Sequence, residues 1–185
     1  TRSVALAVLR HGPISRADVA RLLGLSSGSL TRITKPLIES GVIKQGPPSV
    51  LEIGRPPLPL RVVDESASFL GVKIVPGHAW VVRTGLAGEV HHASELDLDT
   101  TTLESTAQGL AEMVRDAQGL AAVGVCLPAS VEPDGVLHAT RMLRWPGGGN
   151  LSRRLRELTG VDCAAANDID GLTLYQHWFG AGRGL

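Results

Sequence analysis

Three short helical patterns followed by a turn rich in Gly and Pro constrain the fold of this chain more than any other feature. Ser15 can cap the second helix, Gly24 can end it, and Ser26 can cap the third after a short turn. Apolar residues recur at helical spacing and are expected to form the inner faces: Val4, Val8, Leu9, Val19, Leu22, Leu23, Leu30, Ile33, Leu37 and Ile38. The pattern predicts a helix-turn-helix.

The segment after the third helix predicts a β-hairpin. Residues 42–45 and 58–63 are short apolar runs typical of strands, and Gly54-Arg55-Pro56-Pro57 lies in the turn between them. The prolines stiffen the tip and Gly54 removes a side chain from it, so the Arg55 guanidinium can enter a narrow minor groove. Out of context, the same tetrapeptide would be a surface turn with a solvated arginine. The preceding helices favour a wing that contacts DNA.

The outer face of the third helix carries short hydroxyls and cations. These side chains bond phosphate oxygens and base edges when a recognition helix enters the major groove. With the wing arginine, the residues expected to contact DNA are Ser26, Ser27, Ser29, Thr31, Arg32, Lys35 and Arg55.

Charge is divided unequally along the chain, although its formal net charge is zero. Residues 1–63 contain nine Lys or Arg and three Asp or Glu, a net charge of +6, and the remainder carries −6. Only the first part can gain free energy by releasing counterions from a polyanion. Residues 1–63 also contain no Phe, Tyr or Trp, which favours duplex DNA over single strands that stack on aromatic rings.

Several other classes of protein do not fit the composition. The sequence has neither a run of about eighteen apolar residues nor a signal-peptide core, so we expect no membrane association and a cytoplasmic location. Cys126 and Cys163 lie in apolar, strand-like runs and are expected to be buried thiols. His91 and His92 are adjacent and would point to opposite faces of a strand, so we expect no metal site there or elsewhere.

From Asp64 onward the pattern changes to that of an α/β layer. Residues 69–75, 79–84 and 90–96 predict an antiparallel meander, and a helix capped by Thr101 or Thr102 and ended by Gly119 follows. The apolar run 121–127 predicts a strand buried on both sides. A helix over 150–158, a strand over 161–166 and a helix over 169–179 complete the order βββαβαβα.

Four motifs in this second part resemble successive landmarks of one known family. They are Gly124-Val125-Cys126-Leu127-Pro128, Trp145 followed by Asn150-Leu151, Ala166-Asn167-Asp168, and Trp178-Phe179-Gly180-Ala181-Gly182-Arg183-Gly184. The family is the ROK family, which comprises repressors, open reading frames of unknown role and sugar kinases. The resemblance spans nearly the whole chain, because the family's repressors carry a winged helix ahead of this domain.

The resemblance implies an actin-like ATPase fold, of which this chain would hold the first lobe. The family's sugar-contacting Glu and His, its cysteine-rich zinc loop and its second, nucleotide-binding lobe would then lie beyond Leu185. The chain begins without Met and ends where another strand is expected. We therefore expect it to be truncated.

The resemblance also implies an alternative, an ATP-dependent sugar kinase. In the family's kinases the first strand leads into Asp-x-Gly-Gly-Thr, whose glycines approach phosphate and whose acid helps hold magnesium-bound nucleotide. Here Lys73 replaces the acid, and Val75 and Pro76 replace the flexible turn before Gly77. This degenerate loop favours a protein that is not an enzyme.

Asp168 matches the family's catalytic base, which would take a proton from a sugar hydroxyl. The same carboxylate can instead accept hydrogen bonds from a bound sugar, and we assign Asn167 and Asp168 to sugar binding. In the purely structural alternative both residues cap the helix beginning at Ile169. The sugar loop departs from the family's pattern, because Pro128-Ala129-Ser130-Val131 stands in place of Pro-Gly-Pro-Val and Met142 lies where Asn often occurs.

A run of glycines, Gly147-Gly148-Gly149, is not expected to bind phosphate. It lacks the Lys-Ser or Lys-Thr that should follow, and no strand precedes it, so we interpret it as a flexible loop near the ligand cleft.

These observations and the resemblance together predict a transcriptional regulator, expected to repress genes of sugar metabolism. Residues 1–63 would form the winged helix-turn-helix and residues 64–185 the sugar-kinase-like sensor lobe. The expected partners are duplex DNA and a sugar or sugar phosphate, with no cofactor. The resemblance also implies a homodimer or homotetramer.

Overall fold

Polar caps and a glycine set the ends of the first three helices. In the computed structural model, which describes residues 1–46 and 58–182, these helices are α1 (Arg2–His11), α2 (Arg16–Leu23) and α3 (Ser27–Glu39). Ser15 Oγ accepts a hydrogen bond from the amide of Asp18, and Ser26 Oγ accepts one from the amide of Ser29. Gly24 ends α2 with φ of 62°. Both predicted caps and the predicted helix end are confirmed.

The three helices and a short hairpin enclose a small apolar core. Strands β1 (Ile43–Gln45) and β2 (Leu60–Val62) pair antiparallel, as predicted for the base of the wing. The buried residues come from all five elements: Val4, Ala7, Val8, Val19, Leu30, Ile43 and Leu60. The inward position predicted for Leu22 is wrong. Leu22 is 54% exposed beside His11 and Ile14, because the inner side of this two-turn helix is formed by Val19, with Ala20 and Leu23 packed against the same core.

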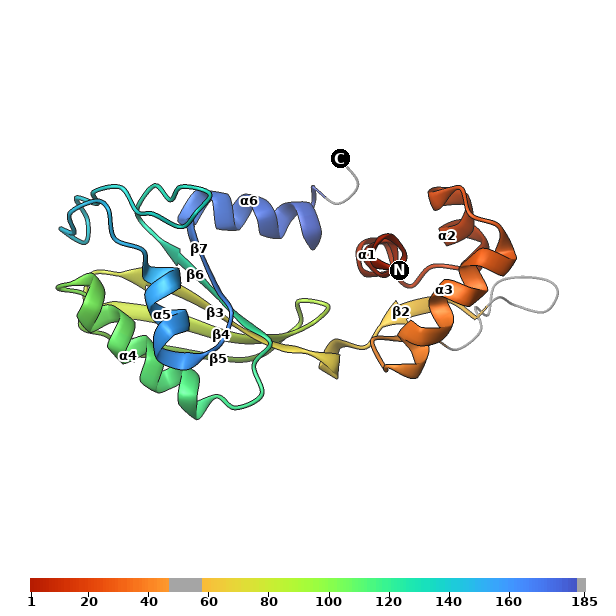
Figure 1. The fold of residues 1–185 in the computed structure, drawn as a ribbon, viewed down its shortest axis with the longest axis horizontal. Helices are drawn as coiled ribbons and strands as arrows, with labels where there is room; N and C mark the ends of the chain where they lie inside the picture. Colours follow the sequence, from red (N-terminus) through yellow and green to blue (C-terminus); the bar gives the residue numbers. More distant parts are fainter. Residues whose placement is uncertain (47–57, 183–185) are drawn as a thin grey trace.

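A five-stranded mixed sheet forms the larger part of the molecule (Figure 1). Its strands are β3 (Ser68–Val75), β4 (His78–Gly85), β5 (Val90–Asp97), β6 (Ala122–Leu127) and β7 (Cys163–Asn167), in the order β5-β4-β3-β6-β7. The first three strands are antiparallel, and β6 and β7 run parallel to β3. The short 3-10 helix η1 (Asp64–Ser66) connects this sheet to β2.

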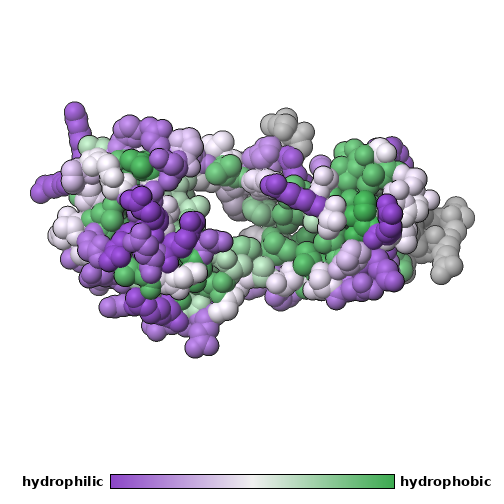
Figure 2. Space-filling model, in the orientation of Figure 1, coloured by the Kyte–Doolittle hydropathy of each residue, from purple (hydrophilic) through white to green (hydrophobic). Residues whose placement is uncertain are grey.

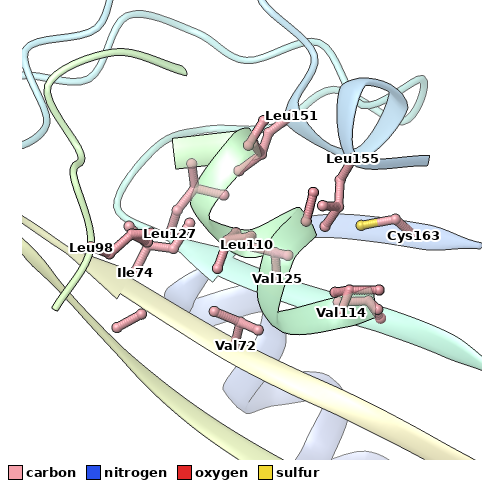
Figure 3. Close-up of a cluster of buried hydrophobic side chains, with 14 of the residues drawn as sticks. Val72, Ile74, Leu98, Leu110, Val114, Val125, Leu127, Leu151, Leu155 and Cys163 are labelled. Atoms are coloured by element: carbon pink, nitrogen blue, oxygen red, sulfur yellow. The ribbon is translucent and has the colours of Figure 1, made fainter. Parts of the chain in front are cut away.

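Two helices cover one face of the sheet and bury the main core. These are α4 (Leu103–Asp116), capped by Thr102, and α5 (Leu151–Thr159), capped by Asn150. Figure 3 shows Leu110 and Val114 of α4 and Leu155 of α5 meeting Val72 and Val125 from the sheet. The predicted end of α4 at Gly119 is wrong by two residues, because Ala117 ends the helix and Gly119 lies in the following turn with φ of 76°.

The opposite face of the sheet carries α6 (Asp168–Trp178) and is less covered (Figure 1). Val123 and Val125 of β6 are buried, whereas Gly124 between them is exposed and Cys126 is half-buried. The prediction that this strand is buried on both sides is therefore wrong. Its uninterrupted apolar sequence does not distinguish a fully covered strand from one with a single covered face.

The surface of the sheet domain is polar over α4 and α5, where Figure 2 shows hydrophilic residues. Within residues 1–46 and 58–182 there is no helix with the length and apolar character needed to cross a bilayer.

Candidate functional site

The outer face of α3 presents polar side chains to solvent. Thr31, Arg32 and Lys35 are exposed, whereas Leu30 and Thr34 on the inner side are buried. Lys35 lies on the same face as Arg32 and Thr31 because it follows them by three and four positions. The Thr34 hydroxyl accepts a hydrogen bond of 2.6 Å from Arg16 of α2, an interhelical brace that sequence patterns did not indicate. This contact helps to fix α3 against α2.

The hydroxyls predicted to contact DNA also bond within the helix. Ser26 Oγ caps α3 and donates to Ser29 Oγ at 3.0 Å. Thr31 Oγ1 donates to the carbonyl of Ser27 at 2.9 Å. Ser26 therefore has a structural role that does not depend on DNA. Ser27 accepts the Thr31 bond through its backbone carbonyl, and its exposed side chain has no hydrogen bond to another part of the chain that the structure describes.

The two cations of α3 are more available. Lys35 Nζ lies 3.8 Å from Glu39 Oε1, but its side chain is 73% exposed, so this pair is weak. Arg32 has no hydrogen-bond or ion-pair partner among residues 1–46 and 58–182. Arg55, the third predicted DNA-contacting cation, lies outside the described residues.

The residues predicted to bind sugar lie where β7 meets α6. Asn167 caps α6, because its Oδ1 accepts from the amide of Ile169 at 2.9 Å while its Nδ2 donates to the carbonyl of Ala129 at 3.1 Å. The structural alternative is thus realised for Asn167. Asp168 is the first residue of the helix, and its Oδ1 is buried with no hydrogen-bond partner within the described part of the chain.

A lysine and a thiol lie close to the Asp168 carboxylate. Lys73 Nζ is 4.0 Å from Asp168 Oδ2 and 5.9 Å from the centre of the Trp80 ring. Cys126 is the cross-strand neighbour of Lys73, and burial, together with the charge of Asp168, raises the pKa of its thiol. A Cβ at Gly171 would lie 2.3 Å from Cys126 Sγ, so glycine lets α6 approach the sheet here.

The turn between β3 and β4 is closed by internal hydrogen bonds. The amide of Gly77 donates to Thr100 Oγ1 at 2.7 Å, and the carbonyl of Gly77 accepts from the amide of Leu98 at 3.1 Å. A turn that cradles phosphate must point free amides at the ligand. This turn instead uses its glycine amide to hold the segment that leads into α4.

The glycine run 147–149 has a packing role. The amide of Gly148 donates to the carbonyl of Leu137, and the amide of Leu137 donates to the carbonyl of Gly149, both at 2.8 Å. A Cβ at Gly149 would lie 2.6 Å from Leu103 Cδ1. The glycines therefore allow two backbone segments and α4 to pack closely.

Asp64, Glu89 and His91 bring three possible metal ligands within 4.8 Å of one another. Sequence patterns place His91 only beside His92 and do not indicate this grouping, because Asp64 is distant in sequence. Asp64 already accepts hydrogen bonds from the amide of Ala87 and pairs with His91 Nε2, both at 2.5 Å. Its position in η1 makes it part of the connection between the two halves of the chain.

The fold and these sites define a class of protein, a winged helix-turn-helix joined to a lobe of the sugar-kinase type. Residues 70–185 match the model of the ROK family, and residues 6–44 match that of winged helix-turn-helix DNA-binding domains. The chain belongs to the ROK family, and the predicted family and fold class are confirmed.

Curated relatives match almost the whole chain. The DNA-binding transcriptional dual regulator NagC of Escherichia coli strain K12 is 31% identical over 94% of this chain, and the DNA-binding transcriptional repressor Mlc of the same strain is 26% identical over 94%. In each case the chain spans 45% of the relative's length.

Solved structures share the fold. A ROK family transcriptional regulator described as a homologue of E. coli Mlc has a TM-score of 0.73 at 23% identity, with 96% of this chain and 48% of that chain covered. A ROK family glucokinase from Streptomyces griseus in complex with glucose and AMPPNP has a TM-score of 0.56 at 17% identity, with 64% and 38% covered.

Proposed function

We propose that this chain is the DNA-reading and effector-sensing part of a transcriptional regulator that represses genes of sugar metabolism. The observation that carries the proposal is the exposed cationic face of α3, joined in one chain to a kinase-type lobe. In this lobe the β3–β4 turn, which would bind phosphate in a kinase, uses its Gly77 amide in an internal hydrogen bond. Relatives that match 94% of the chain are named as a transcriptional dual regulator and a transcriptional repressor. Ser27, Thr31, Arg32, Lys35 and the wing residue Arg55 would contact duplex DNA.

The effector would be a sugar or sugar phosphate bound beside Asp168. A carboxylate oxygen without a partner suits a sugar hydroxyl, which is a hydrogen-bond donor. Catalysis is not part of the proposal. Lys73 places a cation beside Asp168, and the Gly77 amide is already bonded to Thr100, so two parts of a phosphoryl-transfer site are replaced.

DNA reading and effector sensing would belong to separate domains, each with its own apolar core. The first core ends at Val62 and the second begins at Leu70, which supports a boundary between residues 63 and 64. We propose that the protein acts in the cytoplasm as a homodimer or homotetramer, so that two DNA-reading domains face two half-sites.

Selection of bound duplexes from a random DNA pool, followed by affinity measurements with and without hexoses and hexose 6-phosphates, tests the proposal. We expect a defined sequence to be enriched and one sugar class to change its affinity. A coupled assay for ATP consumption with the same sugars tests the kinase alternative. Sugar-dependent ATP turnover, or the absence of any DNA preference, would contradict the proposal.

A further inference from the structure

Two contacts between the DNA-reading part and the sheet domain can be described within residues 1–46 and 58–182. One is the connection through η1. The other lies between α1 and the C-terminal end of α6, which face each other in Figure 1. A cavity of about 450 Å³ lies between the two parts of the chain. Lys44 and Arg61 of the DNA-reading part line one side of it, and Asp64, Glu65 and Glu89 line the other.

The first contact is a fixed joint centred on Asp64. Its backbone carbonyl accepts from the amide of Leu86 at 2.8 Å, and its buried carboxylate bonds to Ala87 and His91. A Cβ at Gly85 would lie 2.0 Å from Asp64 Oδ2, so the joint requires glycine at that position. The chain leaving β2 is therefore pinned to the β4–β5 turn.

Arg10 of α1 takes part in the second contact. Arg10 Nη2 lies 3.2 Å from His177 Nε2, and the Arg10 guanidinium lies 5.3 Å from the centre of the Trp178 ring. Because a guanidinium only donates, His177 Nε2 is the acceptor. Arg10 Nε is buried and has no hydrogen-bond partner among residues 1–46 and 58–182. The interaction is specific but incompletely satisfied, and such a contact can be exchanged for solvent.

Helix α6 connects this contact to the candidate ligand site. It begins at Asp168 and ends at Trp178, a length of eleven residues or about 16 Å. None of these residues is fully buried in the described structure, and the helix approaches the sheet closely where Gly171 meets Cys126. Just beyond its end, Phe179 contacts Gly88 in the turn that also holds Asp64, because a Cβ at Gly88 would lie 3.3 Å from the ring.

We propose that α6 couples ligand binding at Asp168 to the DNA-reading domain. Arg10 is then a positioning residue, because its contact with the C-terminal end of α6 sets the position of α1. The inference rests on the proposed function for the identity of the ligand and of the DNA. A sugar hydroxyl that bonds Asp168 changes the restraints on the first turn of α6. The opposite end of the helix then shifts against Arg10, and α1 carries α3 with it through their shared core.

The contact itself is tested without sugar or DNA. Spin labels at Glu39→Cys in α3 and Glu112→Cys in α4, both exposed positions, report the distance between the two parts. The unsubstituted junction should give one narrow distance distribution, and Arg10→Ala or His177→Lys should broaden it. Arg10→Glu combined with His177→Lys restores attraction and should narrow it again. Arg2→Ala, which removes an exposed cation from the same helix, is the control.

The coupling is tested with the DNA that the protein selects and a panel of hexoses and hexose 6-phosphates. If a sugar changes the native affinity by about tenfold, Arg10→Ala should reduce the change to about twofold while calorimetry shows unchanged sugar binding. A full response in Arg10→Ala, or a distance distribution that Arg10→Ala leaves narrow, overturns the inference. A native protein with a narrow distribution and no response to any sugar overturns the proposed sensing and the coupling, while the contact stands.

Discussion

The two oxygens of the Asp168 carboxylate lie in different surroundings. Oδ2 faces Lys73 at 4.0 Å, and Oδ1 is buried without a partner in the described part of the chain. A buried acceptor without a hydrogen bond costs about 1–3 kcal/mol. Under the proposed function, a sugar hydroxyl would bond this oxygen once the groups that cover it move, and the bond would remove this cost.

Removal of this carboxylate should separate sensing from DNA binding. We expect Asp168→Ala to abolish the change in DNA affinity on adding sugar and to leave the affinity without sugar within about twofold, since the residue is remote from α3. Asp170→Ala removes an exposed acid from the same helical turn and should keep the response. Fluorescence anisotropy with labelled DNA measures both effects. A folded Asp168→Ala protein that no longer binds DNA contradicts the separation.

Arg55 should matter most where the minor groove is narrow. A·T tracts narrow the groove and concentrate negative potential, so Arg55→Ala should lose more affinity at DNA flanked by A·T than by G·C. Arg55→Lys should rescue only part of the preference, because an ammonium is more strongly hydrated than a guanidinium. Binding of the three proteins to one core sequence with exchanged flanks measures this. Equal losses on both flanks would make Arg55 a phosphate contact.

At the scale of the helix, the start of α3 separates a structural serine from one available to DNA. Ser26 Oγ accepts from the amide of Ser29, so Ser26→Ala should lower the free energy of unfolding by about 1 kcal/mol. Ser27→Ala removes an exposed hydroxyl outside the cap and should leave stability nearly unchanged. Denaturant unfolding of the two proteins compares them. Equal destabilisation would mean that the cap contributes nothing to α3.

The two cations of α3 should weaken DNA binding in different ways when removed. A residue that contacts a base changes sequence preference, whereas one that contacts phosphate lowers affinity for all sequences. Arg32→Ala and Lys35→Ala should both reduce affinity, and repeated selection with each variant shows which of them relaxes the preferred sequence. Arg153→Ala, an exposed arginine of α5, is the matched control and should leave both properties unchanged. No loss in either α3 variant would remove this face from the interface.

Local signals in the sequence predicted the elements well. Ser15, Ser26 and Thr102 cap their helices as predicted, because a cap depends on residues only three positions apart. Contacts between distant residues were not predictable. Nothing local joins Arg10 to His177, and neither the closure of Gly77 by Thr100 nor the close packing of the 147–149 glycines follows from composition.

The candidate sites were predicted unevenly for the same reason. The pairing of Lys73 with Asp168 depends on strand register and on the path of α6, which the sequence does not state. Asp168 was found only through the family resemblance, and its unsatisfied oxygen became visible only in the structure. Asn167, found in the same way, turned out to cap α6.

Across the whole molecule, zero net charge is the sum of two unlike parts. Residues 1–63 carry +6 and residues 64–185 carry −6. Such a molecule has a strong charge asymmetry, so a polyanion attracts one end and repels the other. Repulsion of the acidic end would orient the basic end toward DNA during the encounter and discourage contact through the sheet domain.

This asymmetry predicts a steep salt dependence of DNA binding in a chain without net charge. Each phosphate contact contributes about 0.9 to the negative slope of log K against log salt, and that slope depends on contacts at the interface rather than on total charge. For the intact chain we expect a slope that corresponds to several phosphate contacts. For a variant that lacks one phosphate-contacting cation, we expect the magnitude of the slope to be smaller by about 0.9. The Arg153→Ala control should keep the native slope. Titrations of labelled duplex at a series of potassium chloride concentrations provide the measurement, and a slope near zero would exclude an electrostatic interface on the basic part.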